Sequence, residues 1–477
     1  MYAYYIVCIL NTIQKNAFKP KPANPPPRFT PAQLLLFFLQ LLPHRALRRL
    51  PALKHKTFYD RLFTPLVTLW YLLFQRLNPD HSLDAALADV QAGGADKLNR
   101  KLARQLLSSS TASYSDARQR LPWEFLAQAL RLQGRKITTQ SPTALWKGMV
   151  LALLDGSTVR LRPYGNIPQE FAPHGNQHQK RTYWCLMRVA VNFCCRTGAA
   201  LDCALGSLHL SEQALGCEII LRALGSSLFI GDRNFGVFRI VQAARHNQQQ
   251  VLLRLTEVRA AKLLGRALRC TDQAIPWKPT RHDQLPPGLS QDPVQGRLSI
   301  VRLQRPGFRT QWLCLFTTLN DTAQYPLEEL VRLYGMRWHV ELDLRYVKAQ
   351  LESAQLEAHS AAMARKEWLA ALLAYNLVRA AMLCAALQAA IQPLTLSFSA
   401  CRRRLESWLR DFGRSKVGIS ASWKNTLAEI TRCLLPHRPR PRPTEPRAQR
   451  HLRESFPPLI GSRVRAREKL QNHAAKS

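Results

Sequence analysis

Acidic residues are scarce in this sequence relative to basic ones. The chain of 477 residues holds 31 Asp and Glu against 68 Lys and Arg, a formal net charge of +37. Such a surplus favours binding to a polyanion such as nucleic acid, because neutralised phosphates supply affinity for any base sequence. On charge alone, ribosomal or membrane-surface binding also fits, and so does a genome rich in Arg codons.

Long apolar runs and paired cysteines are also missing. The runs LLLFFLQLL and LVTLWYLLF are too short to span a bilayer. The opening residues MYAYYIVCIL lack the basic region and cleavage site of a signal peptide. No Cys-x-x-Cys occurs, which argues against a structural zinc motif, and we expect the cysteines to be reduced core residues. These absences predict a cytoplasmic protein with no membrane partner.

The remaining composition favours a folded protein of several domains. An apolar content of 46% can build real cores and argues against global disorder. Residues 1–32 contain the basic stretch KPKPANPPPRF and are expected to form a mobile, Pro-rich lead. Residues 33–107 have helical periodicity with basic groups between the helices, so they form either a DNA-binding domain or an ordinary helical one. Residues 108–144 start as a Ser-rich linker and continue as a helix.

From residue 145 onward, strands followed by helices indicate an α/β fold. Residues 145–249 contain the buried-strand runs GMVLALLDGSTVRL and SSLFIGDRNFG, with two strands joined by an Arg-Thr-Gly turn between them. Residues 250–320 are predicted to be a β-rich insertion. Residues 321–395 are helical, with one helix starting near Pro326. Residues 396–477 are expected to be a helical segment and then a disordered, basic tail.

Three carboxylates are candidates for one site. Two predicted strands end at Asp155 and Asp232, both beside glycines, and a carboxylate at a strand end lies where open α/β folds place their sites. The third, Glu341, lies in the helix that starts near Pro326. Three carboxylates on one core repel one another unless cations bind between them, and oxygen ligands suit Mg²⁺ or Mn²⁺. On spacing alone, a turn residue or a surface charge explains any one of them.

Four polar residues interrupt the apolar pattern of LVRLYGMRWHVELDLRYVKAQL. Tyr334, Arg337, Glu341 and Lys348 occur at offsets of 0, 3, 7 and 14. On one helix they would share a stripe about 60° wide and about 21 Å long. A solvated polar face with ion pairs is the ordinary explanation of such a stripe, and a functional surface is the alternative.

The combined motifs identify a family resemblance. DGSTV, GDRNFG and Tyr334-x2-Arg337-x3-Glu341-x6-Lys348 resemble the DDE transposases of bacterial insertion sequences. The match is to the branch with the Tyr-Arg-Glu-Lys signature, insertion-sequence family four, and all four residues fit without a gap. The stretch LAYNLVR also resembles the family's following helix. The resemblance covers residues 35–390 and leaves out the lead and the tail.

The resemblance implies an RNase H-like catalytic core with a β-rich insertion between the second Asp and the Glu. It implies that Asp155, Asp232 and Glu341 bind two Mg²⁺ ions, for which Mn²⁺ can substitute. Family members cut double-stranded DNA at the terminal inverted repeats of their element and join the freed 3′ ends to target DNA. Some relatives pass through a hairpin, and a homodimer on paired ends is the expected assembly.

The resemblance also implies DNA-binding residues. By position, Tyr334, Arg337 and Lys348 match residues that hold the terminal DNA. Relatives that flip a base use an aromatic side chain in the β insertion. Here Trp277, beside two prolines, is the preferred candidate, whereas Trp312 lies between apolar strand residues and is expected in the core.

Two other functions remain open at this point. An RNase H-like nuclease, or a repurposed inactive copy, would keep the fold without transposition, although all three acids are present. A non-enzymatic, basic nucleic-acid-binding protein would explain the charge and the tail but would leave the spacing of the acids to chance.

Overall fold

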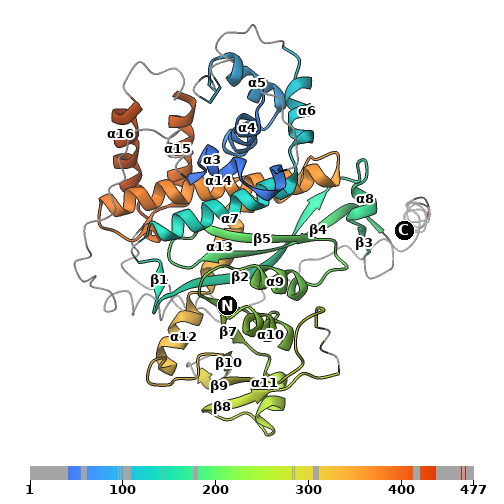
Figure 1. The fold of residues 1–477 in the computed structure, drawn as a ribbon, viewed down its shortest axis with the longest axis vertical. Helices are drawn as coiled ribbons and strands as arrows, with labels where there is room; N and C mark the ends of the chain where they lie inside the picture. Colours follow the sequence, from blue (N-terminus) through green and yellow to red (C-terminus); the bar gives the residue numbers. More distant parts are fainter. Residues whose placement is uncertain are drawn as a thin grey trace, which may run out of the picture.

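The computed structural model describes residues 41–436, except 55–61, 95, 97, 100–108, 142, 176–180, 282, 284, 304–310 and 412–418, together with residues 464 and 468. The predicted lead and most of the predicted basic tail therefore lie outside the described residues. Within the described chain, one mixed sheet of eleven strands carries helices on both faces (Figure 1).

The centre of the sheet joins an antiparallel meander to parallel strands. β4 (Arg181–Cys194) pairs antiparallel with β2 (Met149–Leu161) and with β5 (Ala200–Gly206), and the predicted Arg-Thr-Gly turn links β4 to β5. On the other side of β2 lies β6 (Ser227–Gly231), followed by β7 (Gln250–Arg254), and these neighbours are parallel. All of β6 is buried, as expected for a parallel strand covered on both faces.

The strands of the predicted β-rich insertion extend this same sheet. β10 (Gln311–Thr317) pairs antiparallel with β7, and β9 (Val294–Leu303) and β8 (Thr271–Trp277) continue the order. The prediction started the insertion at residue 250, but β7 belongs to the central sheet, so the added part begins after it with α11 (Glu257–Leu264). The short apolar run VLLRL predicts a strand in the central sheet as well as it predicts one in the insertion, because the run itself does not show which strand it will pair with. Three short strands, β1 (Leu145–Trp146), β3 (Pro173–Gly175) and β11 (Gln355–Leu356), complete the sheet.

A layer of helices covers the face of the sheet that is uppermost in Figure 1. α7 (Trp123–Thr139) and α14 (Ala361–Gln388) pack on each other and on β5, and α4 (Pro65–Leu77) packs on α14. Glu367 of α14 forms ion pairs at 3.2 Å with Arg76 and with Arg118. The N-terminal helices therefore share one hydrophobic core with the sheet. The layer also includes α3 (His44–Arg48), η1 (Pro51–Leu53), α5 (Leu83–Gln91), α6 (Ala112–Arg120), η4 (Pro393–Thr395), α15 (Phe398–Asp411) and α16 (Ile419–Thr431).

Among the described helices, α14 is long and apolar enough to cross a membrane by length and composition alone. Its most apolar stretch is completely buried inside the protein, which is the position of a core helix. The apolar character of α14 is accounted for by its neighbours, because α4, α7, α15 and α16 all pack against it.

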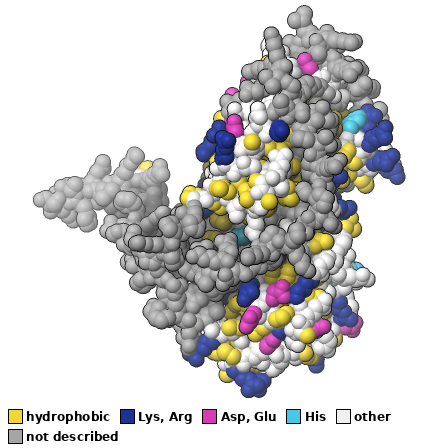
Figure 2. Space-filling view, turned by 90° about the vertical axis from the view of Figure 1, so that its left-hand side faces the viewer, with side chains coloured by type: hydrophobic (Ala, Val, Ile, Leu, Met, Phe, Trp, Pro, Cys, Tyr) yellow, Lys and Arg dark blue, Asp and Glu magenta, His cyan; other side chains and the backbone are white. Residues whose placement is uncertain are grey.

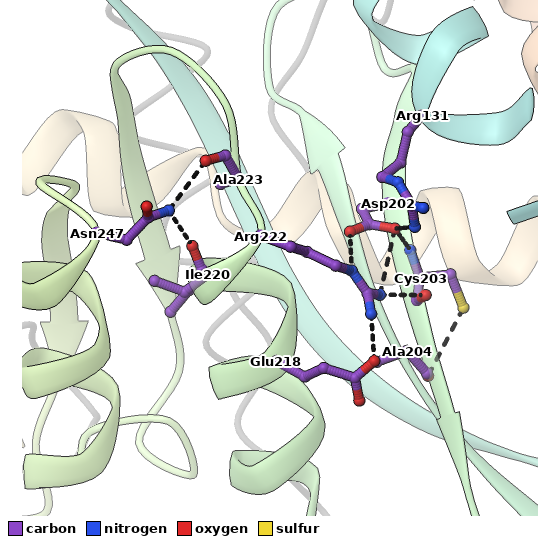
Figure 3. Close-up of polar contacts among 9 residues, drawn as sticks. All are labelled: Arg131, Asp202, Cys203, Ala204, Glu218, Ile220, Arg222, Ala223 and Asn247. Carbon is purple, nitrogen blue, oxygen red and sulfur yellow. Dashed lines mark hydrogen bonds and ion pairs between the residues drawn. The ribbon is translucent and has the colours of Figure 1, made fainter. Parts of the chain in front are cut away.

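The opposite face is covered by α9 (Glu212–Leu221) and α10 (Phe238–His246). Arg222, at the end of α9, donates from Nε to Asp202 Oδ2 at 2.6 Å and from Nη2 to the Cys203 carbonyl at 2.7 Å (Figure 3). Asp202 also receives a hydrogen bond from Arg131 of α7 at 3.3 Å. Asp202 on the edge strand β5 thus anchors a helix from each layer.

The segment with the four-residue stripe is not one continuous helix. It consists of α12 (Leu327–Gly335), α13 (Trp338–Arg345) and a π-helical turn, η3 (Tyr346–Gln350). The prediction of a single helix was wrong in this respect, although α12 does begin directly after Pro326. Because π turns shift the angular spacing of residues, side chains before and after them do not share a regular 100° stripe. The remaining short helix, α8 (Ile167–Glu170), follows β2.

Candidate active site

Asp155 and Asp232 lie on neighbouring parallel strands. Leu154 of β2 is paired with Gly231 of β6, so the next residue of each chain segment is one of the two aspartates. Asp232 directly follows β6, as predicted. Asp155 does not end its strand, because β2 continues to Leu161 in pairing with β4. The two aspartates therefore sit where the β2–β6 pairing ends and the strands begin to separate.

Backbone amides orient both aspartates. The Gly156 N–H donates to Asp155 Oδ1 at 2.9 Å, and the Asn234 N–H donates to Asp232 Oδ1 at 2.9 Å. The loop after Asp232 is held by Phe235, which is completely buried beside Gly231. Each carboxylate thus keeps one fixed oxygen and has a second oxygen for another partner.

Glu341 is presented by α13, which packs against β2. Its Oε1 accepts a hydrogen bond from Arg337 Nη2 at 2.7 Å, and the two form an ion pair. Burial raises the pKa of Asp155 to about 7, a shift that the Gly156 amide and Arg337 oppose and that Asp232 and Glu341 increase. The charges of Asp232, Glu341 and Arg337 therefore all act on the Asp155 carboxylate.

The donor chemistry of this group fits a divalent cation. Within the described ranges, no three His, Cys, Asp or Glu side chains are gathered tightly enough to hold a metal ion as they stand. At Glu341, the cation present is the Arg337 guanidinium. Carboxylate oxygens are the ligands that Mg²⁺ prefers, and a buried aspartate with a raised pKa is stabilised by a cation. The acids are thus of the ligand type that the ion prefers, and in the structure Arg337 occupies one oxygen of Glu341.

The other residues of the stripe face the interior. Tyr334 is 3% exposed, and burial raises the pKa of its phenol, which is hydrogen-bonded to Arg254. Lys348 is half-buried, and its Nζ donates to Ser157 Oγ at 3.1 Å and to the Thr158 carbonyl at 3.0 Å. The stripe therefore contacts the central strands beside Asp155 and is not a solvated helix face.

The two tryptophans of the added strands occupy different environments from those predicted. Trp277 is 3% exposed and packs edge-on against Phe316, with the ring centroids 4.7 Å apart. Trp312 is only half-buried, and the guanidinium of Arg302 lies 5.6 Å from its ring centroid. The prolines beside Trp277 do not leave its side chain exposed. β8 pairs with β9, and the Trp277 side chain lies in a buried hydrophobic cluster.

Sequence reasoning missed the residues that hold α13 in place. Asp343 Oδ1 accepts from Arg379 Nη2 of α14 at 2.5 Å, and both side chains are 4% exposed. Arg379 Nε also donates to the Tyr375 hydroxyl at 2.7 Å, and that hydroxyl donates to the Gly198 carbonyl. Two features of the sequence could have indicated this pair. Asp343 follows Glu341 by two residues, and Arg379 lies within a long apolar stretch, where a buried charge must find a partner.

Comparisons with known proteins match a segment that includes this site. Residues 146–377 match the family model described as the transposase DDE domain. The chain is similar to the transposase InsG for insertion sequence element IS4 of Escherichia coli (strain K12), with 23% identity over 276 residues. The similarity covers 56% of this chain and 60% of that protein. The matched segment contains all three candidate acids.

Proposed function

We propose that this chain, whose residues 146–377 match the family model of the transposase DDE domain, is a DDE transposase that carries out cut-and-paste transposition of an insertion sequence. The observation that carries the proposal is the meeting of Asp155 and Asp232 at the end of the β2–β6 pairing, within electrostatic reach of Glu341. Two carboxylates on neighbouring strands, with the charge of a third acting on one of them, repel one another and so oppose folding, which favours a functional reason for their placement.

The order of the central strands supports an RNase H-like core as part of the proposal. An antiparallel meander of β2, β4 and β5 is joined through β2 to the parallel strands β6 and β7. The first acid lies on the first strand of the meander and the second follows the first parallel strand. This places both at the same end of adjacent strands, where a helix such as α13 can bring the third.

The proposed chemistry assigns a separate task to each side chain. Asp155, Asp232 and Glu341 would hold two Mg²⁺ ions, which supply activation of the attacking oxygen and stabilisation of the leaving one in phosphoryl transfer. Arg337 can leave Glu341 and bind a phosphate through two N–H groups. Lys348, which now donates to two oxygens of β2, can place a point charge beside the same DNA strand.

The proposed partner is the double-stranded DNA of the terminal inverted repeats, and afterwards the target DNA. A homodimer on paired ends and a nucleoid-associated, cytoplasmic location belong to the same proposal. If a hairpin intermediate with a flipped base forms, Trp312 is the better candidate to stack on that base. Trp277 would first have to leave the core. The phenol of Tyr334 could reach DNA only after leaving its contact with Arg254.

Cleavage of end DNA tests this function. We expect labelled duplexes that carry the two ends of the element to be cut in Mg²⁺ by the wild-type protein, with cleavage lost in Asp155→Ala, Asp232→Ala and Glu341→Ala. DNA binding, measured by gel shift, should be retained by all three variants, because each loses a metal ligand and no cation. Glu328→Ala is the matched control, since Glu328 is an exposed acid on the preceding helix α12.

Two outcomes would redirect the proposal. Cleavage at positions unrelated to the terminal inverted repeats would favour an RNase H-like nuclease. Specific binding with no cleavage by wild-type protein would favour a repurposed copy or a DNA-binding protein. Full activity of the Glu341→Ala protein would exclude the three-acid mechanism.

A further inference from the structure

A fourth acid, Glu212, lies between the two segments that carry the proposed catalytic aspartates. It is the first residue of α9, whose N-cap is Ser211. The Ser211 hydroxyl accepts the Ala214 N–H at 3.1 Å, so the helix start is capped without help from Glu212. The Glu212 carboxylate is therefore available for contacts outside its own helix.

One of these contacts reaches the segment of Asp232. Asn234 Nδ2 donates to Glu212 Oε2 at 2.6 Å, and the backbone N–H of Asn234 donates to Asp232 Oδ1 at 2.9 Å. The neighbouring Gln213 donates from Nε2 to Asn234 Oδ1 at 2.8 Å and to the Asn234 carbonyl at 3.1 Å. Two adjacent residues of α9 thus hold both polar atoms of the Asn234 side chain, and Asn234 orients Asp232.

The other contact reaches the segment of Asp155. Gly156 follows Asp155 and donates its N–H to that carboxylate. A Cβ atom at position 156 would lie 2.4 Å from Glu212 Cδ and 2.7 Å from Glu212 Oε2, so Glu212 occupies the space that any other residue would fill. Any other residue at position 156 would therefore displace the Glu212 side chain from its present position.

Helix α9 is a firm support for Glu212. Its far end is tied to β5 through the hydrogen bonds that Arg222 donates to Asp202 and to the Cys203 carbonyl (Figure 3). Its own residues Leu215 and Cys217 are buried, and α9 packs against β2, β4 and β5. The position of Glu212 is thus set by the sheet and not by a mobile loop.

We propose that Glu212 is a positioning residue of the active site, which sets the relative placement of Asp155 and Asp232 through Gly156 and Asn234. The inference rests on the proposed function, because it concerns the metal-dependent reaction of that site. Glu212 itself binds neither metal nor DNA in this scheme. Loss of its hydrogen bond leaves the Asn234 side chain held by Gln213 alone, so that Asn234 and the Asp232 carboxylate can shift, which weakens metal binding by the pair of aspartates.

The test measures Mn²⁺ binding to the protein by calorimetry without DNA, and the rate of end-DNA cleavage over a Mg²⁺ titration. Glu212→Ala should bind Mn²⁺ more weakly than wild type. Glu212→Ala should cut about 10- to 100-fold more slowly and need more Mg²⁺ for half-maximal rate, the range typical of residues that orient metal ligands. Glu212→Gln keeps an oxygen that accepts from Asn234 and should stay within about threefold of wild type. Asn234→Ala should resemble Glu212→Ala, and the double variant should be no slower than either single one, because both act through one hydrogen bond.

Glu218→Ala is the matched control on the same helix. Its carboxylate is exposed, binds Arg222 and does not contact either aspartate segment, so its half-maximal Mg²⁺ concentration should equal that of wild type. An unchanged Mg²⁺ requirement in Glu212→Ala would overturn the positioning role, whatever the melting temperature. Multiplying rate losses in the double variant would do the same. If wild-type protein cuts no end DNA, the proposed function fails instead, and the two failures are distinguishable.

Discussion

Arg337 illustrates how one side chain can serve two states of a site. In the structure its guanidinium pairs with Glu341 and acts electrostatically on Asp155. A divalent ion bound to the same carboxylates would compete with it, and a guanidinium released from Glu341 would be free to bind a phosphate. Metal binding and DNA binding are thus coupled at a single residue in the proposed mechanism.

This coupling predicts opposite effects of one substitution. Arg337→Ala should lower the Mn²⁺ dissociation constant about two- to fivefold, because a partly exposed ion pair contributes up to about 1 kcal/mol. The same variant should bind end DNA more weakly and show a smaller salt slope. Calorimetry and gel shift measure the two effects. Arg345→Ala, an exposed arginine on the same helix, should leave Mn²⁺ binding unchanged, and weaker Mn²⁺ binding by Arg337→Ala would contradict the competition.

At the scale of elements, the placement of α13 depends on a buried ion pair. Asp343 of α13 binds Arg379 of α14, and the Arg379 guanidinium lies 5.3 to 5.6 Å from the rings of Tyr346, Tyr375 and Phe398. These rings come from η3, α14 and α15, so one arginine joins these three elements to α13, the helix that carries Glu341. The Asp343–Arg379 ion pair therefore fixes α13 although the helix is interrupted before it and followed by a π turn.

Removing one partner of this pair should be costly. Asp343→Ala leaves the Arg379 charge buried without its carboxylate and should lower the free energy of unfolding by about 3–5 kcal/mol. Asp343→Ala combined with Arg379→Leu should lose less than the two single variants together, because no buried charge is left. Urea unfolding measures both values. Additive losses would show that Asp343 and Arg379 act independently.

At the scale of the whole molecule, the segment that matches the DDE family model (the DDE segment, residues 146–377) does not contain its own complete core. The match begins at Trp146, yet Tyr71 of α4 and Phe125 and Leu130 of α7 are completely buried in the cluster shared with α14. The space-filling view of one face shows Lys and Arg side chains dispersed over the described surface, with acidic residues among them (Figure 2). Because buried residues of α4 and α7 belong to the cluster shared with α14, the N-terminal helices contribute to the stability of the matched segment.

A fragment of residues 140–395 should accordingly fail to fold. Without α4 and α7, the apolar surface of α14 is exposed, so we expect aggregation in gel filtration and no cooperative urea transition. A chain lacking residues 437–477 is the control and should unfold cooperatively, because the buried residues of the described chain end at Ile430. A monomeric fragment with a sharp transition would show that the DDE segment folds independently.

The sequence by itself determined the features that depend on neighbouring residues. The apolar runs before Asp155 and Asp232, the Arg-Thr-Gly turn and the start of a helix after Pro326 were predictable, because each is a short-range pattern of burial or backbone preference. The same patterns indicated three candidate acids and their chemistry, including the helix that carries Glu341.

Only the tertiary structure decided which side chains face one another. The burial of Trp277, the pairing of Arg337 with Glu341, and the contact of Glu212 with Gly156 all join residues from separate elements. Strand partners, helix breaks and buried charges are selected by the free energy of the whole packed core, and a local window of sequence does not contain those partners.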